Sequence, residues 1–191
     1  MKRHLPAHCY QKPRGIYFQR RGWPADLVEA YRAAAPQGSR ERIIFELGIG
    51  TGQRPGDLIK MRWDDIKDGG IQVRQNKTGA VLWLPLTRAL RAALDATKRS
   101  VLTICADGQG RPTTYRRAAE VVLAVRKAIG AEAFDMHSWR YTAASELGAA
   151  GCSDELIGSV TGHRTTAMIS KYAGAARQRA RATEAMGKRD K

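Results

Sequence analysis

The chain carries the run Gly162-His163-Arg164-Thr165-Thr166-Ala167-Met168-Ile169-Ser170-Lys171-Tyr172, in which a phenol follows an imidazole by nine residues. A second run, His137-Ser138-Trp139-Arg140, lies just upstream. Within a helix, residues three apart share one face, so one side chain can move a proton while the other binds an oxygen. A phenol beside two imidazoles and several guanidiniums has the chemistry to attack a phosphodiester. Taken separately, each run also fits an ordinary surface helix or a packing tyrosine.

Two further cations stand at turns. Arg54 lies in Thr51-Gly52-Gln53-Arg54-Pro55-Gly56-Asp57, after an apolar helix. Its planar guanidinium matches two phosphate oxygens, and Asp57, three residues on, can hold it in place. Lys77 lies at or beside the tip of a predicted hairpin, from which a flexible ammonium can enter a DNA groove and donate a proton to a leaving oxygen. The alternative for both residues is an exposed, solubilising charge.

Charge is unevenly distributed along the 191 residues. The 33 Lys and Arg outnumber the 18 Asp and Glu and give a net charge of +15. Residues 1–24 hold six basic and no acidic residues, and residues 164–191 hold eight basic and two acidic ones. This clustering predicts a polyanion as partner, and a nucleic acid above all. A merely soluble basic protein is the alternative.

Several other classes of protein do not fit. Cys9, Cys105 and Cys152 are odd in number and far apart, so they indicate neither a disulfide framework nor a zinc site, and a reducing cytoplasm suits them. His4 and His8 stand beside Cys9 alone in the basic end, and we expect no metal there. No apolar stretch approaches the roughly 20 residues that a membrane span requires. The basic N-terminus lacks the apolar run of a signal peptide.

The periodicity predicts a mainly α fold with a small antiparallel β-sheet (α+β). Ile16-Tyr17-Phe18 indicates a short strand, helices are expected to begin near Pro24 and at Ser39, and Pro55 suits a first helical position. Ile71–Arg74 alternates as a strand, Asn76–Gly79 forms a turn and Val81–Leu84 continues as a second strand, which predicts a hairpin with Lys77 at or beside its tip. The remaining helices are expected over Thr87–Lys98, Thr113–Ile129, Met136–Ala149, Ser153–Val160 and Ala167–Tyr172, with a basic tail helix from Ala175 to Met186.

Taken together and in order, these residues resemble the tyrosine recombinase (phage integrase) family. The pattern runs through Thr51-Gly52-Gln53-Arg54-Pro55-Gly56-Asp57-Leu58, Lys77, His137-Ser138-Trp139-Arg140, Thr161-Gly162-His163 and Tyr172. Each piece is weak alone, whereas their order and spacing are specific in combination. The resemblance covers about residues 23–175 and implies the catalytic-domain fold of that family.

The resemblance implies a role for each position. Tyr172 would attack a scissile DNA phosphate and leave a 3′-phosphotyrosine with a free 5′-hydroxyl. Arg54 and Arg140 would bind the non-bridging oxygens, and His163 would add a third donor. His137 would act as general base and Lys77 would protonate the departing 5′ oxygen. Asp57 would support Arg54, and no metal or nucleotide cofactor is implied. Thr161 replaces a leucine common before Gly162, and we expect no chemical consequence.

Double-stranded DNA is the implied partner, bound by a homo-oligomer, a tetramer in the family. Candidate DNA contacts outside the catalytic set are Lys2, Arg3, Lys12, Arg14, Arg20, Arg21, Arg74 and Arg164. The expected division is a basic arm with short strands over 1–22, a catalytic domain over 23–175 and a basic tail over 176–191. The family's helical core-binding domain has no counterpart in the arm, which suggests a shortened integrase or a naturally small recombinase.

Two alternatives remain open. Supercoil relaxation by the same cutting chemistry, as in type IB topoisomerases, needs only a monomer. A shortened integrase that binds DNA without recombining it needs no catalysis, although six intact catalytic positions argue against such decay.

Overall fold

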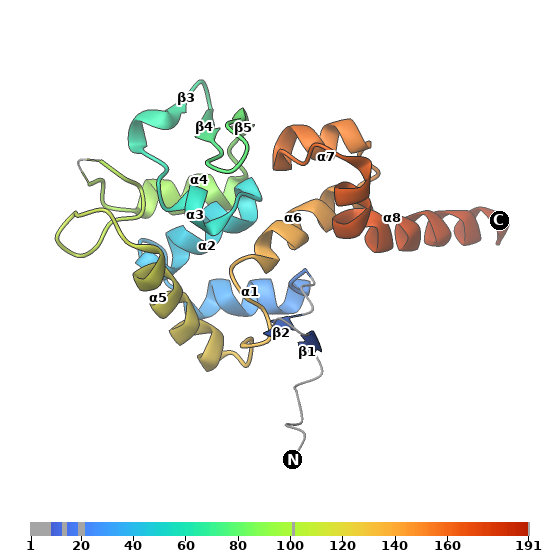
Figure 1. Cartoon of the computed structure of the whole chain (residues 1–191), viewed down its shortest axis with the longest axis horizontal. Helices are drawn as coiled ribbons and strands as arrows, with labels where there is room; N and C mark the ends of the chain where they lie inside the picture. The colour runs from blue at the N-terminus through green and yellow to red at the C-terminus, as the bar shows by residue number, and fades with distance from the viewer. Residues whose placement is uncertain (1–8, 13–14, 19–21, 101, 191) are drawn as a thin grey trace, which may run out of the picture.

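The computed structural model describes residues 9–12, 15–18, 22–100 and 102–190, the first two ranges by their backbone alone. The elements are β1 (Cys9–Lys12), β2 (Gly15–Phe18), α1 (Ala25–Ala34), α2 (Arg40–Thr51), α3 (Pro55–Leu58), a 3-10 turn (Trp63–Asp65), β3 (Ile66–Lys67), β4 (Gly70–Arg74), β5 (Val81–Pro85), α4 (Arg88–Ala96), α5 (Tyr115–Ala128), α6 (Ser138–Ala149), α7 (Asp154–Thr161) and α8 (Thr166–Arg189). Helices α1, α2, α4 and α5 form one body, and α6 leads from it to α7 and α8 (Figure 1). The predicted α+β class is confirmed.

An aromatic cluster forms the centre of the core. Tyr31 stacks on Phe45 with their ring centroids 4.0 Å apart, and Phe45 meets Trp139 edge to face at 5.5 Å. Trp23 contacts all three rings, and its backbone N–H donates to Thr142 Oγ1 across 2.8 Å. Ring packing of this kind adds to the free energy of burial. It fixes α6, the helix that carries Arg140, against α1 and α2.

The sheet is antiparallel in the order β3-β4-β5, with Ile71 opposite Leu84 and Gln72 opposite Trp83. The predicted hairpin is therefore confirmed, and its turn carries Lys77. Strand β3 was not predicted, because two residues are too few to show an alternating pattern. The strand predicted at Ile16–Phe18 forms as β2 and pairs with β1. In Figure 1 the β3-β4-β5 sheet lies on the same side of the molecule as α7.

Two predicted helix limits need correction. The expected helices Ala167–Tyr172 and Ala175–Met186 are one continuous helix, α8, because Gly174 costs an α-helix only about 1 kcal/mol and does not end it. The expected domain limit at 175 lies inside this helix. Helix α6 begins at Ser138 and not at Met136, since Asp135 Oδ1 accepts a hydrogen bond from Ser138 N at 2.9 Å. His137 is consequently the N-cap of α6 and not the second residue of the helix.

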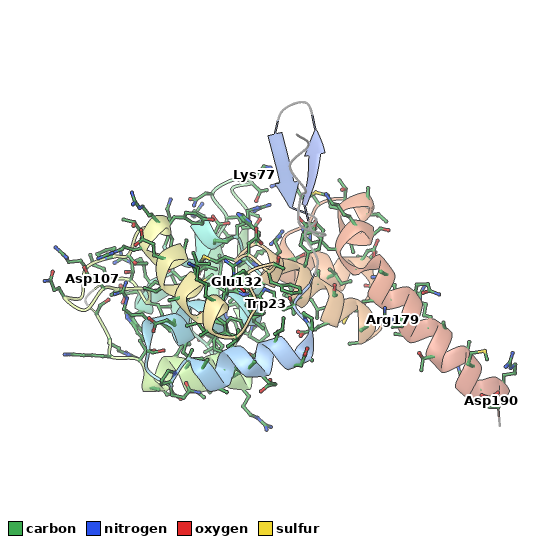
Figure 2. The ribbon with its side chains drawn as sticks, turned by 90° about the horizontal axis from the view of Figure 1, so that it is seen from below. Trp23, Lys77, Asp107, Glu132, Arg179 and Asp190 are labelled. Atoms are coloured by element: carbon green, nitrogen blue, oxygen red, sulfur yellow. The ribbon has the colours of Figure 1, made fainter. Side chains whose placement is uncertain are left out.

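Helix α8 extends beyond the body of the protein. Its first turns pack on α6 and α7 through the buried side chains of Ala144, Ile157, Ile169 and Ala173. Arg179 and Asp190 lie on the part that points away from the other elements (Figure 2). Within the described residues, no helix combines the length and the apolar character needed to cross a bilayer.

Candidate active site

Arg140 enters the site from the buried first turns of α6. Its Nε donates to His163 Nε2 at 3.2 Å, and its Nη1 donates to the carbonyl of Gly52 at 2.8 Å. Its Nη2 is buried and has no hydrogen-bond partner among the described residues. Burial first, and then the positive charge of Arg54, lower the pKa of Arg140 to about 10. The side chain thus remains a cation at neutral pH, with one donor left over.

The carbonyl that receives Arg140 is placed by the end of α2. Gly52 caps this helix in the left-handed region, at φ 62°, which is unfavourable for a residue with a Cβ. A Cβ there would also come within 3.0 Å of Ala143 Cβ on α6. Glycine therefore allows the end of α2 to approach α6 closely enough for the bond to Arg140.

His163 follows the left-handed C-cap of α7, Gly162. Its Nδ1 lies 2.8 Å from Thr161 Oγ1, and this hydroxyl donates to the carbonyl of Ile157. Since Nε2 accepts from Arg140, the proton of the neutral ring resides on Nδ1 and is donated to Thr161. Burial first, and then the positive charges of Arg140 and Arg54, lower the pKa of His163 to about 4. The hydroxyl of Thr161 thus accepts a hydrogen bond from His163, a contact that a leucine at this position could not make.

The depressed pKa of His163 predicts a loss of stability in acid. In the unfolded chain its pKa returns to about 6.5, so between pH 6.5 and 4 the unfolded state binds the proton more tightly. The stability that folding gains from keeping this ring neutral is fully present above pH 6.5 and is lost as the pH falls toward 4. Between pH 7 and pH 5 the wild-type protein should lose about 2 kcal/mol more free energy of unfolding than His163→Gln. Urea titrations followed by tryptophan fluorescence measure both losses, and equal losses would contradict the assignment.

Arg54 is the N-cap of α3, directly before Pro55 at the first helical position. Its Nη1 donates to Gln75 Oε1 at 3.3 Å and lies 3.8 Å from Asp57 Oδ2. Asp57 is buried, and its other oxygen accepts from the backbone N–H of Asn76 at 3.0 Å. The side chain of Arg54 is 21% exposed, so its cation can meet an incoming anion.

Tyr172 reaches the same place from the second turn of α8. Its ring stacks on Tyr141 at 3.9 Å between centroids and lies 4.4 Å from the ring of His163. Ser145 Oγ donates to the carbonyl of Tyr172 at 2.8 Å and fixes this turn of α8 on α6. The phenol also acts electrostatically on the pKa of Arg140. The structure therefore gathers Arg54, Arg140, His163 and Tyr172 into one cluster.

Two of the predicted catalytic residues lie at the margin of this cluster. Lys77 is exposed in the β4-β5 turn, at the periphery of the molecule (Figure 2). The same turn is tied to the loop after α7, because Arg164 Nη2 donates to the carbonyl of Thr78 at 2.8 Å. His137 is half-buried at the N-cap of α6, and its carbonyl accepts from the N–H of Arg140.

The candidate DNA contacts fall into two groups. Arg74 and Arg164 are exposed at the end of β4 and after α7. Lys12 is described only by its backbone, in β1, and Lys2, Arg3, Arg14, Arg20 and Arg21 lie outside the described residues. No group of three or more His, Cys, Asp or Glu side chains is placed to hold a metal ion in the part of the chain that the structure describes.

Gln75 contacts this cluster and was not predicted from the sequence. It is fully buried at the end of β4, where its amide bonds Arg54 on one side and the carbonyl of Thr161 on the other. In the sequence Gln75 is a single polar residue before a turn, and polar residues at such positions are usually exposed. Only the pairing of a buried amide with residues 21 and 86 positions away distinguishes it.

Comparison with known proteins identifies the relatives of this chain. Residues 25–179 match the phage integrase family. The putative integrase/recombinase y4gC of Sinorhizobium fredii is 30% identical over 168 residues, which cover 78% of this chain and 83% of the relative. The integrase of Escherichia phage lambda is 30% identical over 160 residues, which cover 77% of this chain and 45% of the relative.

Solved structures of phage integrases share the fold of this chain. A crystal structure of a lambda integrase dimer bound to a COC′ core site superposes with a TM-score of 0.68 at 31% identity, over 82% of this chain and 60% of that one. The chain spans about half the length of the curated phage integrases it matches. The resemblance read from the sequence is thereby confirmed: this chain belongs to the phage integrase family.

Proposed function

We propose that the chain is the catalytic part of a site-specific DNA recombinase or integrase that cuts and rejoins DNA through a 3′-phosphotyrosine. The observation that carries the proposal is the meeting of Arg54, Arg140, His163 and Tyr172, which come from four different elements. Two guanidiniums at one place repel each other unless an anion lies between them. A phosphate supplies that anion, and the phenol beside it supplies the nucleophile.

The proposed reaction uses the groups in sequence. The Tyr172 oxygen attacks phosphorus while its proton passes to His137, and the bond from phosphorus to the 5′ oxygen breaks. Lys77 donates the proton that the departing oxygen takes up. Negative charge that builds on the non-bridging oxygens is stabilised by Arg54 and Arg140. The phosphotyrosine keeps the bond energy for rejoining, so the chemistry calls for no metal or nucleotide.

The hydrogen bonds of Arg140 place a condition on this reaction. Its unpartnered Nη2 is enclosed, so a phosphate reaches it only when a neighbouring side chain moves aside. A buried donor without a partner costs about 1–3 kcal/mol, and bonding to a phosphate recovers that cost. In this geometry His163 Nε2 accepts from Arg140 and orients it. To donate to the phosphate itself, His163 has to release Arg140 and take the other tautomer.

The experiment that tests the proposal is covalent trapping. A duplex nicked beside the scissile phosphate releases a short fragment after attack, so the phosphotyrosine persists and moves slowly on a denaturing gel. Attachment sites that flank the gene supply candidate duplexes. Absence of an adduct with a duplex that the protein binds would overturn the proposal and favour a protein that only binds DNA. A supercoil-relaxation assay run beside it would detect the topoisomerase-like alternative.

The proposed partner is double-stranded DNA, bound by a tetramer of the chain. Lambda integrase has been solved as a dimer on a core site and as a tetramer on a Holliday junction. The outer part of α8 is basic and projects from the body, where a neighbouring copy or a DNA phosphate can meet it. We place the reaction in the cytoplasm, in keeping with the free thiols of Cys105 and Cys152. We also propose that residues 23–175 form the catalytic domain, between a basic arm over 1–22 and a basic tail over 176–191 in which helix α8 continues.

DNA binding is expected to weaken at least about a hundredfold between 50 and 200 mM salt, because phosphate contacts release counterions. Arg74→Gln should lower the slope of log affinity against log salt by about one, since Arg74 is exposed at the end of β4, next to the Lys77 turn. Fluorescence anisotropy with a labelled duplex measures both slopes. Arg116→Gln, on the outer surface of α5, is the matched control and should leave the slope unchanged. An affinity that does not change with salt would contradict the charge argument.

A further inference from the structure

Gln75 closes the turn that carries Lys77. Its backbone N–H donates to the carbonyl of Ala80 at 2.8 Å, and its own carbonyl accepts from the N–H of Gly79 at 2.9 Å. Residues 76–79 are therefore held as a closed turn on a residue whose side chain is fully buried. The position of the exposed Lys77 thus depends on how firmly Gln75 is held below it.

The Gln75 amide uses all of its hydrogen-bonding capacity. Nε2 donates to Gln53 Oε1 at 2.7 Å and to the carbonyl of Thr161 at 2.9 Å. Oε1 accepts from Arg54 Nη1 at 3.3 Å and from Thr78 Oγ1 at 2.8 Å. The reverse orientation of the amide would set its nitrogen against the guanidinium and its oxygen against two acceptors. The orientation is consequently fixed by its four partners.

Two neighbours extend this network to the loop before His163. Gln53 Nε2 donates to the carbonyls of Thr51 and Val160, both at 2.9 Å, and so joins the ends of α2 and α7. Gly162 lies directly against Gln75, so that a Cβ at this position would collide with the amide. A buried network in which every group is satisfied favours one arrangement of the segments that it joins.

We propose that Gln75 is a positioning residue that holds the Arg54 guanidinium, the Lys77 turn and the His163 loop in a single geometry. Its amide is a neutral acceptor for Arg54, nearer than the Asp57 carboxylate at 3.8 Å. A neutral acceptor orients the guanidinium and adds no further negative charge beside it. Through Thr78, the same oxygen holds the turn from which Lys77 protonates the leaving group. This inference rests on the proposed strand-cleavage function.

Two substrates separate positioning from general stability. One nicked duplex has the ordinary phosphodiester, and the other has sulfur in place of the bridging 5′ oxygen. A thiol has a pKa of about 8.5, so sulfur leaves as the thiolate without a proton donor, whereas a departing alkoxide oxygen needs a proton donor. Misplacing Lys77 should therefore slow cleavage of the oxygen substrate more than cleavage of the sulfur substrate.

Gln75→Met keeps the volume of the side chain and removes its four bonds. Single-turnover cleavage of the oxygen substrate should slow by about 30-fold. On the sulfur substrate the loss should shrink to about fivefold or less, and this remaining loss reflects the misplaced guanidinium of Arg54. Thr78→Val removes the bond to Gln75 Oε1 and the longer bond, at 3.4 Å, that Thr78 Oγ1 accepts from the N–H of Ala80 in the same turn. It should slow the oxygen reaction about fivefold, with near-complete recovery on sulfur. Gln72→Met, three residues earlier on β4, is the matched control and should cleave both substrates at the wild-type rate.

Several outcomes would overturn the inference. Wild-type rates for Gln75→Met on the oxygen substrate would do so, as would equal losses on both substrates. If Gln75→Met does not unfold cooperatively in urea, the variant is misfolded and Thr78→Val alone tests the inference. A loss of cleavage rate in Thr78→Val that is as large on the sulfur substrate as on the oxygen substrate would then overturn it. Failure of the wild-type protein to form any adduct would remove the proposed function and this inference with it. If the wild-type protein forms the adduct and the Gln75 and Thr78 variants cleave at its rate, the inference is wrong and the proposed function stands.

Discussion

Tyr172→Phe is expected to abolish covalent capture of a nicked duplex, with a loss of at least about 10³-fold, and to leave DNA affinity within about twofold. The substitution removes only the hydroxyl. The phenyl ring can still stack on Tyr141 at 3.9 Å and lie beside His163 at 4.4 Å, so the fold of the site should persist. Covalent adduct on a denaturing gel and fluorescence anisotropy with the same duplex measure the two quantities.

Tyr141→Phe is the matched control, because Tyr141 is the ring stacked on Tyr172 and is only 8% exposed. It should retain covalent capture within about threefold, since its ring contributes packing to the site. The pair of variants distinguishes the two phenols that the structure places side by side. Adduct formation by Tyr172→Phe, together with its loss in Tyr141→Phe, would identify Tyr141 as the nucleophile and overturn the role proposed for Tyr172.

Local signals account for how well the fold was predicted. Ser39 caps α2 because its hydroxyl accepts from the N–H of Arg42, and Pro55 opens α3 because it needs no hydrogen-bond donor there. Apolar and polar residues alternate over Ile71–Arg74 and a turn follows at Asn76–Gly79, and five residues of β4 pair with five of β5. Features without a local signal were missed. Strand β3 is too short to alternate, and the continuity of α8 through Gly174 depends on its packing against α6.

The site shows the same division. The order of Arg54, Arg140, His163 and Tyr172 along the chain was sufficient to suggest that they meet, although their separations span more than a hundred residues. Nothing in the sequence indicated that Arg140 would bond the carbonyl of Gly52, or that Gln75 would bond the carbonyl of Thr161. These contacts use the backbone of one partner, and a backbone carbonyl is present at every position. Only the folded arrangement decides which carbonyl receives the bond.

Arg140→Lys is expected to slow cleavage by about 10²–10³-fold while the positive charge is kept. Arg140 bonds His163 and the carbonyl of Gly52 and still has Nη2 free of protein partners, so its planar fork can hold two protein groups and a phosphate at once. An ammonium on a flexible stem cannot fix these three directions. Single-turnover cleavage of the nicked duplex measures the effect.

Arg126→Lys is the matched control for this change. Arg126 is also a guanidinium that donates to backbone carbonyls, those of Ala131 and Glu132, and burial likewise lowers its pKa. It lies on α5, outside the cluster around Tyr172, so its cleavage rate should remain within about threefold of wild type. Equal losses in the two variants would trace the defect to stability and not to phosphate binding. A wild-type rate for Arg140→Lys would show that charge alone suffices, in which case the fixed fork between His163 and Gly52 has no part in the transition state.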